Sequence, residues 1–400
     1  MKLMKILSIS SVFPSKRMPF SGLFVYERMR HVSQRAEVTV ISPVPWSPFD
    51  RLARLFRKNF RNGRKGFETR GGMAVRYVPF FCLPGIFKFM DGFFYYLGIK
   101  RPANTIFKKD KPDIIDVHFA YPDGFGVMMA AGGLGIPFCV TLRGTEMPYS
   151  RSFYRRWQMK LVFKKAAKII SVSRSLAGIA INLGAEPEKV KVIPNGVDTS
   201  LFAPKNKDEA RKNFDIPKNA KVILCVGGLV KRKGFHRVIK HLQKLQKIFP
   251  CLMFLIVGGE SAEGDYSEKL KAQVKELRLE SVVRFEGQQS PEKLPWYYSA
   301  ADLFVLATAN EGWPNVIVES LACGTPVVAT DVGGIKEIMS HDYLGYTVPF
   351  GDSQALYAKM EKALTQSWDH EKITAHAQQR SWTNVADEVL ATFTQVLKEV

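Results

Sequence analysis

The sequence has few cysteines, and their spacing does not suggest pairs. Five stand singly along the 400 residues, at positions 82, 139, 225, 251 and 323. An odd number of isolated cysteines argues against a disulfide framework and is typical of a reduced compartment. We therefore expect a cytoplasmic protein.

The chain also lacks a long uninterrupted apolar run. Its most aromatic stretch, residues 80–100, contains Pro84, Lys88 and Asp91 and is too broken for a membrane-spanning helix. The first residues, MKLMKILSISSVFPS, carry a lysine inside the apolar run and soon turn polar, which predicts a strand instead of a signal peptide. We expect a protein that is soluble or lies on a membrane surface.

Acidic residues are scarce in the first half only. Residues 1–200 contain 33 Lys and Arg against 13 Asp and Glu, a net charge of +20, whereas the remainder contains 25 against 24, a net charge of +1. This asymmetry predicts that one half faces an anionic surface or polymer. A nucleic-acid-binding protein is an alternative, but no recognised nucleic-acid-binding module is present.

Short β-branched runs alternate with longer helical patterns along the whole chain. One series runs from KILSIS (5–10) to VKVIP (190–194), and a second from VILCVGG (222–228) to PVVATD (326–331). Apolar strands separated by helices predict parallel sheets covered on both faces. Because 400 residues exceed one core, we expect an α/β protein with two doubly wound, Rossmann-like domains in tandem and a site between them.

Two glutamates stand eight positions apart in ANEGWPNVIVES (309–320), at Glu311 and Glu319. Residues 315–323 have helical character, preceded by Pro314 and closed by Gly324. Backbone N–H groups at a helix start favour a phosphate, and the two carboxylates can accept hydrogen bonds from hydroxyls on either side of it. A ligand with hydroxyls flanking a diphosphate is a nucleotide sugar. The alternative is a capping glutamate beside a solvated one.

Two glycine-rich turns favour the ligand interpretation. VGGLVKRKG (226–234) follows a predicted strand and places three cations at the expected start of a helix, where they oppose the helix dipole unless an anion is bound. TDVGGIKEIM (330–339) contains a second such turn. The P-loop order is absent, and no G-x-G-x-x-G follows the first strand, which argues against a Rossmann oxidoreductase.

With these motifs, the second half resembles the donor domain of the family 4 glycosyltransferases, which have the GT-B fold. The resemblance rests on the glutamate pair and on SLACGTPVVATDVGGIKE (320–337), and matching segments extend over nearly the whole chain. In the first half these segments are PFSGLFV (19–25), DVHFAYPDG (116–124), TLRGTE (141–146) and IPNGVD (193–198). The implied domains are residues 1–198 for the acceptor and 199–380 for the donor, with a terminal helix at about 381–400 that packs back on the first domain.

The resemblance also implies individual roles. Glu311 would hold sugar hydroxyls, Glu319 the ribose hydroxyls, and His118 would lie near the reacting end of the sugar, which makes Glu311 and His118 the catalytic candidates. A lone histidine is otherwise more often a core residue. The family usually has Arg at the position of Gly228, and Arg232 is the candidate to compensate. The implied donor-binding residues are Gly22, Arg143, Glu146, Asn195, Gly228, Arg232, Lys233, Gly312, Trp313, Pro314, Asn315, Val316 and Glu319.

The activity implied by the resemblance is that of a retaining hexosyltransferase. It would move a sugar from a nucleoside diphosphate, expected to be UDP or GDP, to a hydroxyl of a lipid-linked or glycan acceptor in polysaccharide or glycolipid biosynthesis. Neither a metal nor a cofactor is implied, and no His/Cys/Asp cluster has metal-ligand spacing. A phosphorylase with pyridoxal phosphate, or an enzyme with a soluble small acceptor, are the alternatives.

Residues 49–61 have the pattern of a helix lying in a membrane interface. One side carries Phe49, Leu52, Ala53, Phe56 and Phe60, and another carries Arg51, Arg54, Lys58 and Arg61. Residues 80–100 and 150–165 add aromatics beside more cations. We predict a peripheral protein on the inner face of the cell membrane, with an anionic membrane surface and no nucleic acid as partner. The alternative is a set of core aromatics covered by a solvated charged face.

Overall fold

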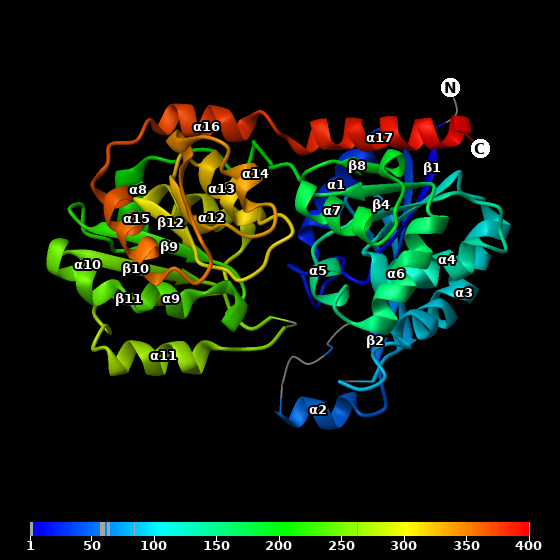
Figure 1. The fold of residues 1–400 in the computed structure, drawn as a ribbon, viewed down its shortest axis with the longest axis horizontal. Helices are drawn as coiled ribbons and strands as arrows, with labels where there is room; N and C mark the ends of the chain where they lie inside the picture. Colours follow the sequence, from blue (N-terminus) through cyan, green and yellow to red (C-terminus); the bar gives the residue numbers. More distant parts are fainter. Residues whose placement is uncertain (1–2, 57–60, 62–64, 84, 262, 400) are drawn as a thin grey trace. The chain divides into compact units, whose positions relative to one another are not determined.

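The computed structural model describes residues 3–56, 61, 65–83, 85–261 and 263–399. The chain divides into two compact units (Figure 1). The first unit contains residues 1–195 and 382–400, and the second contains residues 196–381. The division thus falls between Asn195 and Gly196, whereas the boundary predicted from the sequence follows residue 198.

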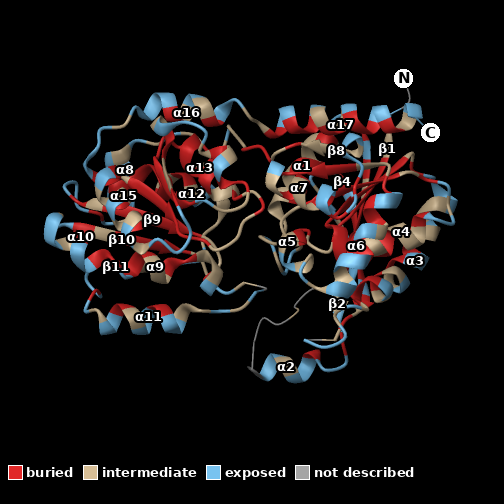
Figure 2. Cartoon of the chain, viewed as in Figure 1, coloured by how far each residue is buried: buried red, intermediate tan, exposed pale blue. Residues whose placement is uncertain are grey.

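The first unit is built on an eight-stranded sheet with the order β3-β4-β2-β1-β5-β6-β7-β8. All neighbouring strands are parallel except β3 and β4. β5 and β6 are buried along their whole length, as expected for central strands covered on both faces (Figure 2). The strands are β1 (Lys5–Ile9), β2 (Glu37–Trp46), β3 (Gly66–Arg70), β4 (Met73–Phe81), β5 (Ile114–His118), β6 (Phe138–Leu142), β7 (Lys168–Ser171) and β8 (Val190–Val192).

Most helices of this unit lie between successive strands, and the C-terminal helix follows the last strand. They are α1 (Leu23–Val32), α2 (Asp50–Phe56), α3 (Asp91–Lys109), η1 (Ala120–Gly124), α4 (Phe125–Ala131), α5 (Glu146–Tyr149), α6 (Phe153–Lys165), α7 (Arg174–Asn182), η2 (Pro187–Lys189) and α17 (Trp382–Glu399). None of the described helices is long and apolar enough to cross a membrane.

The C-terminal helix α17 completes the core of the first unit. Its buried residues recur at spacings of three and four, the period of one helix face. Through Val389 and Phe393 this face joins the cluster that contains Val25 and Met29 of α1, and Figure 1 shows α17 lying along α1. The last 19 residues therefore belong structurally with the first 195.

The second unit has a six-stranded parallel sheet with the order β11-β10-β9-β12-β13-β14. Alternate residues of β9 enter two different cores, Val222 and Leu224 on one face and Ile223 and Cys225 on the other. This alternation is the period of a strand, so both faces of the sheet are covered. The strands are β9 (Lys221–Val226), β10 (Leu252–Val257), β11 (Val283–Gly287), β12 (Leu303–Leu306), β13 (Val327–Thr330) and β14 (Gly345–Val348).

The helices of the second unit are mostly short. They are α8 (Lys207–Asn213), η3 (Lys231–Lys233), α9 (Phe235–Ile239), α10 (Leu242–Ile248), α11 (Ser267–Glu276), η4 (Pro291–Lys293), α12 (Leu294–Ala300), α13 (Asn315–Ala322), α14 (Ile335–Ile338), η5 (Asp342–Leu344), α15 (Ser353–Thr365) and α16 (His370–Gln378).

Each sheet reverses its strand order beside its own first strand. In the first unit the chain moves outward from β1 to β2 and returns on the other side of β1 with β5. In the second it moves outward from β9 to β11 and returns beside β9 with β12. Connections leave in opposite directions at such a point, which opens a crevice at the carboxyl ends of the two strands. The segments after β1, β5, β9 and β12 are therefore the places to look for a site.

Candidate functional site: two strand-order reversals

His118 is the last residue of β5, at the reversal point of the first sheet. It is fully buried. Its Nδ1 lies 3.0 Å from a terminal guanidinium nitrogen of Arg143, and its Nε2 lies 3.4 Å from both Ser8 Oγ and Asp116 Oδ2. Because a guanidinium can only donate, Nδ1 must accept and therefore carries no proton. The neutral ring of His118 thus has its proton on Nε2.

A buried ion pair supports this histidine from below. Arg28 of α1 donates from one terminal nitrogen to both oxygens of Asp116, at 3.1 and 3.0 Å, and from the other to Thr141 Oγ at 2.9 Å. Burial works to raise the pKa of Asp116, but Arg28, His118 and Arg143 together outweigh it and hold that pKa below its usual range. Burial lowers the pKa of His118 to about 4 although Asp116 opposes this. His118 is consequently neutral near pH 7.

Arg143 and Glu146 organise the loop that follows β6. The buried carboxylate of Glu146 accepts from the backbone N–H groups of Ala120, Arg143 and Gly144 at 2.8–3.1 Å, which joins the segments after β5 and β6. Arg143 also donates to Asn195 Oδ1 at 2.6 Å. Three of the predicted residues, together with His118, therefore meet in one network within the first unit.

Gly22 ends the loop after β1 and immediately precedes α1. It has φ of 68°, and a Cβ there would lie 2.5 Å from the carbonyl oxygen of Val12. Only glycine permits both this left-handed backbone and so close an approach of the Val12 backbone. The position shapes the β1–α1 turn at the reversal point.

In the second unit, Glu311 follows β12 and is paired with two cations. Its Oε1 lies 2.7 Å from Lys233 Nζ, 3.0 Å from a terminal nitrogen of Arg232 and 3.1 Å from Thr308 Oγ. Among the described residues, no hydrogen bond to Oε2 is found. One carboxylate oxygen is thus held by the protein while the other is available to a ligand.

The three cations of the KRK segment do not open a helix, so that prediction was wrong. They form the separate turn η3, and Gly234, with φ of 82°, divides this turn from α9. The left-handed backbone at Gly234 prevents one continuous helix. η3 therefore places two of the cations, Arg232 and Lys233, against Glu311.

The loop from Glu311 to Pro314 leads directly into α13, with Pro314 as the residue before the helix and Asn315 and Val316 as its first two residues. A Cβ at Gly333 would lie 1.7 Å from the carbonyl oxygen of Glu311, so the second glycine turn supports this loop from beneath. Gly312 and Pro314 are buried.

Trp313 carries an indole nitrogen that is buried without a hydrogen-bond partner among the described residues, as is Asn310 Oδ1. A buried polar atom without a hydrogen-bond partner costs free energy. Such atoms are commonly found where a ligand or water supplies the missing hydrogen bond. Both atoms belong to the loop that carries Glu311.

Glu319 lies one turn inside α13 and accepts from Tyr298 Oη at 2.9 Å. Burial raises the pKa of Glu319 to about 7, against the lowering effects of that hydrogen bond and of the Lys233 charge. Its carboxyl group is therefore close to half ionised at neutral pH.

Gly228, after β9, is crowded by the neighbouring turn. A Cβ at this position would lie 2.9 Å from Ser261 Cβ. A long side chain therefore does not fit here without a shift of Ser261, and the cation nearest to Glu311 besides Lys233 is Arg232.

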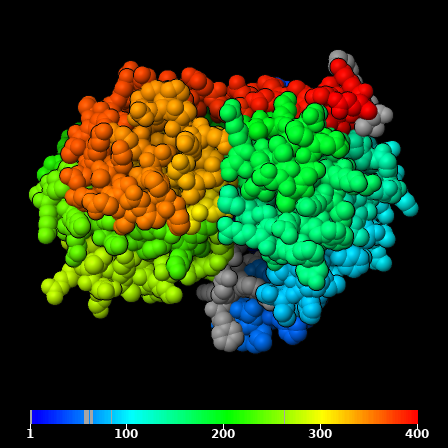
Figure 3. Space-filling model, in the orientation of Figure 1, coloured from blue at the N-terminus to red at the C-terminus, as the bar shows by residue number. Residues whose placement is uncertain are grey.

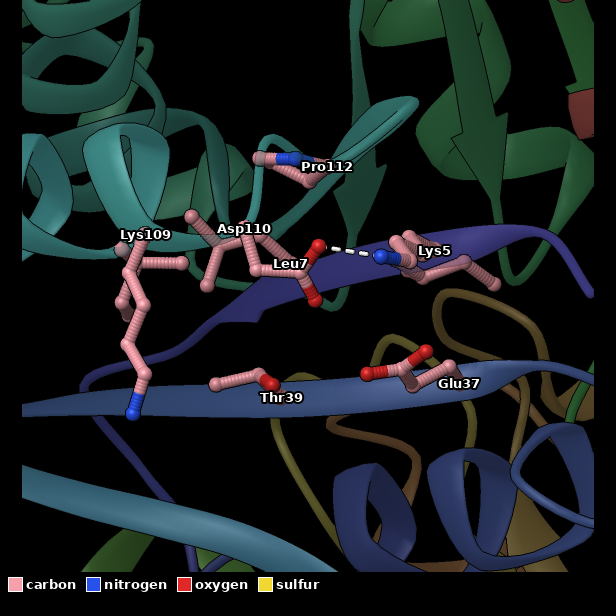
Figure 4. Close-up of a pocket in the computed structure, with 9 residues that line it drawn as sticks. Lys5, Leu7, Glu37, Thr39, Lys109, Asp110 and Pro112 are labelled. Carbon is pink, nitrogen blue, oxygen red and sulfur yellow. Dashed lines mark hydrogen bonds and ion pairs between the residues drawn. The ribbon is translucent and has the colours of Figure 1, made fainter.

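A small hollow of about 220 Å³ lies at the other end of the strands of the first sheet (Figure 4). Lys5 and Glu37 begin β1 and β2 there, and the ammonium of Lys5 pairs with the carboxylate of Asp110 beside it. The hollow lies at the amino ends of the strands, away from the reversal point.

The described residues contain no group of three or more His, Cys, Asp or Glu side chains that could hold a metal ion.

Sequence reasoning missed the residues that support the predicted ones. Asp116 could have been found, because it stands two positions before His118 and so faces the same side of β5. Thr308 stands three positions before Glu311 in the same loop. Arg28 and Tyr298 come from other elements, and no local pattern marks them.

Solved structures share this fold, which has two Rossmann-like units. HepE of Anabaena, crystallised with UDP, is 23% identical with a TM-score of 0.74, and the match covers 98% of this chain and 100% of that one. A sucrose-phosphate synthase of Thermosynechococcus elongatus is 19% identical with a TM-score of 0.80 over 99% and 100% of the two chains. The fold is that of the GT-B glycosyltransferases.

The sequence identifies the family. Residues 206–380 match the glycosyl transferases group 1, and residues 22–201 match Glycosyltransferase Family 4. TuaC of Bacillus subtilis strain 168, provisionally named as a teichuronic acid biosynthesis glycosyltransferase, is 30% identical over 97% of this chain and 93% of its own length. A D-inositol 3-phosphate glycosyltransferase of Acidothermus cellulolyticus is 30% identical, but the match spans only 54% of this chain and 50% of that protein. The chain belongs to family 4 of the glycosyltransferases.

We expect His118 to remain neutral with its proton on Nε2 from pH 5 to pH 8, since Arg143 donates to Nδ1 and burial lowers its pKa to about 4. Nitrogen-15 NMR of protein labelled at histidine measures the tautomer. His31 is the internal control, because its Nδ1 lies 2.9 Å from the backbone carbonyl oxygen of Glu27 and so must carry the proton when the ring is neutral. Protonation of His118 on Nδ1 in this range would contradict the arrangement.

Proposed function

We propose that this protein transfers a sugar from a nucleoside diphosphate, UDP or GDP, to a hydroxyl of a glycan or lipid-linked acceptor in polysaccharide biosynthesis. The nucleotide sugar binds to the domain of residues 199–380, and the acceptor to the domain of residues 1–198. The assignment of polysaccharide biosynthesis follows the name of TuaC, which matches this chain over nearly its whole length.

The observation that carries this proposal is the cluster after β9 and β12. Lys233 and Arg232 supply positive charge beside the N-terminus of α13, and Glu311 keeps one carboxylate oxygen available. Phosphates bind to such a combination of cations and N–H groups at a helix start, and we assign this role to the amides near Asn315 and Val316. Glu311 is then placed for sugar hydroxyls and Glu319 for the ribose.

We infer a retaining transfer in which the protein supplies position and charge stabilisation. The leaving phosphate oxygen accepts the proton of the acceptor hydroxyl as the new glycosidic bond forms, so neither a protein base nor a metal is required. In the transfer, Lys233 and Arg232 stabilise the charge that develops on the departing diphosphate. His118, neutral and rigidly held, lies near the reacting end of the sugar.

The first unit exposes an unusual number of large apolar side chains. Among the described residues, thirteen of the seventeen such side chains fall between residues 46 and 97 or between 153 and 157. They are Trp46, Phe49, Leu52, Leu55, Phe67, Ile86, Phe87, Phe89, Phe93, Leu97, Phe153, Tyr154 and Trp157. Scattered apolar residues need no explanation, but a concentration of this kind marks an interaction surface.

Ring contacts join these segments into continuous patches. The ring of Phe89, which precedes α3, lies 5.1 Å from that of Tyr154 on α6, and Phe81 connects Trp46 with Phe94 at 6.4 and 4.9 Å. The predicted helix of residues 49–61 is described only as α2, from Asp50 to Phe56, and Lys58 and Phe60 lie outside the described residues. Figure 3 shows the blue side chains of this segment at the lower edge of the first unit.

Cations accompany the exposed rings. On and beside α6, Arg151, Arg156 and Lys160 are exposed next to Phe153 and Trp157. Each basic residue near an anionic leaflet contributes about 1 kcal/mol, and aromatic rings favour the headgroup region. We propose that this surface holds the protein on the inner face of the cell membrane, where a lipid-linked acceptor is found.

We expect Glu319→Gln to weaken UDP or GDP binding by about 1–3 kcal/mol, because a charged acceptor of the ribose hydroxyls is lost. In the unchanged protein, affinity should fall as the pH is lowered through about 7, since protonation of Glu319 removes that charge. The variant should lose this part of the pH dependence. Titration calorimetry between pH 6 and pH 8 measures both effects.

Glu286→Gln is the matched control for this measurement. Glu286 also accepts from a tyrosine, Tyr297, at 3.0 Å, but it lies on β11 outside the proposed site. The control should bind the nucleotide as the unchanged protein does. Equal affinity in Glu319→Gln and in the control would refute the ribose assignment.

The product should keep the anomeric configuration of the donor. Proton NMR of the product, recorded early in a reaction with the accepted sugar nucleotide, distinguishes the two anomers before they equilibrate. An early product of opposite configuration would reject the retaining mechanism while leaving the family assignment intact.

The protein should sediment with phosphatidylglycerol vesicles at low salt and less at physiological salt, and it should not sediment with phosphatidylcholine vesicles. Replacing Leu55, Phe153 and Trp157 by Ser should reduce the bound fraction several-fold, since each exposed apolar side chain adds to interfacial binding. Phe350→Ser, at an exposed position of the second unit, is the control and should change nothing. Negligible sedimentation with both lipids would move the acceptor toward a soluble molecule.

A further inference from the structure

Every nitrogen of the Arg232 guanidinium is already engaged within the second unit. Its Nε and one terminal nitrogen donate to the two carboxylate oxygens of Glu263 at 2.9 and 2.6 Å. The other terminal nitrogen donates to the carbonyl oxygen of Asn310 at 2.7 Å and to Glu311 Oε1 at 3.0 Å. Four of its five N–H groups are therefore committed, so a phosphate can take the paired N–H groups of Arg232 only if Glu263 leaves.

The two carboxylates that hold Arg232 differ in how firmly they are fixed. The side chain of Glu311 is 10% exposed, and Lys233 and Thr308 also donate to it. The side chain of Glu263 is 53% exposed, and Arg232 is its only ion-pair partner among the described residues. Exposed ion pairs contribute little to stability, so Glu263 is the partner that can leave.

The side of Arg232 that Glu263 occupies is also the side suited to a phosphate. A carboxylate and a phosphate both accept the paired N–H groups of a guanidinium in the same two-pronged geometry. The hydrogen bonds from Arg232 lower the pKa of Glu263, which keeps it ionised. Arg232, Lys233, Glu263 and Glu311 together carry no net charge, so the departure of Glu263 would leave a net positive charge for an incoming diphosphate.

We propose that Glu263 is a displaceable carboxylate that occupies the phosphate-binding side of Arg232 in the free protein and yields it to the donor diphosphate. This inference rests on the proposed function, because it assigns Arg232 to the diphosphate. The carboxylate returns to Arg232 when the sugar has been transferred, competes with the nucleoside diphosphate and hastens its release. Glu263 thus sets the affinity for substrate and product without touching either.

Glu263→Gln tests the inference with inorganic pyrophosphate and UDP as probes. The neutral amide keeps the size of the side chain but competes poorly for Arg232, so the affinity for both probes should rise roughly 3- to 10-fold, mainly through slower dissociation. Calorimetry gives the affinities and stopped-flow displacement the rates. Glu268→Gln is the control, since it removes another exposed carboxylate of the same unit, one that pairs with Lys271 at 2.9 Å.

The same change made together with Arg232→Ala separates displacement from general electrostatics. Without Arg232 there is no guanidinium to release, so the double variant should bind pyrophosphate like Arg232→Ala alone. An equal gain in both backgrounds, or a gain in Glu268→Gln, would overturn the inference, as would unchanged or undetectable pyrophosphate binding by Glu263→Gln. A gain for pyrophosphate without any binding of UDP or GDP would instead contradict the proposed function and leave the displacement supported.

Discussion

The reversal of strand order beside β1 and beside β9 is the constraint on which the rest of this protein depends. Parallel strands align their carboxyl ends, and a reversal leaves the space beyond two of those ends open. In the first unit this brings His118 into contact with Ser8 of β1 and with the loop after β6, and in the second it brings Glu311 against η3. Each reversal of strand order thus brings residues from distant parts of the sequence together at the carboxyl ends of the strands.

Charge compensation is the second organising feature. Below His118, Arg28 and Asp116 form a buried pair, and Thr141 accepts a further guanidinium N–H group. Removing either partner would leave an unpaired buried charge, which is costly. Around Glu311 the compensation is partly exposed and involves flexible side chains. The first cluster is suited to hold a neutral histidine in one tautomer, and the second to exchange one anion for another.

Predictions from local sequence pattern were confirmed where neighbouring residues determine the structure, and were wrong where a tertiary contact determines it. The alternation of apolar strands with helices, the start of α13 at Asn315 and the family were all confirmed. The prediction that a helix begins with the KRK segment was wrong. The helix α9 begins after it, because Gly234 adopts a left-handed backbone where Ala307 packs against it. β3, β4 and β14 were missed, since β3 and β14 are short and none of the three has the continuous apolar pattern of a central strand.

The sequence by itself determined the fold class, the family and the segments that line the two reversal points, because apolar periodicity and turn glycines act over a few neighbouring residues. Only the tertiary structure decided which side chains meet there. The tautomer of His118 follows from Arg143, 25 positions away, and the ionisation of Glu319 follows from burial and from Tyr298. The occupation of Arg232 by Glu263 depends on a turn that lies 31 positions along the chain. Hydrogen bonds and desolvation act through space, and the order of residues in a sequence does not encode those distances directly.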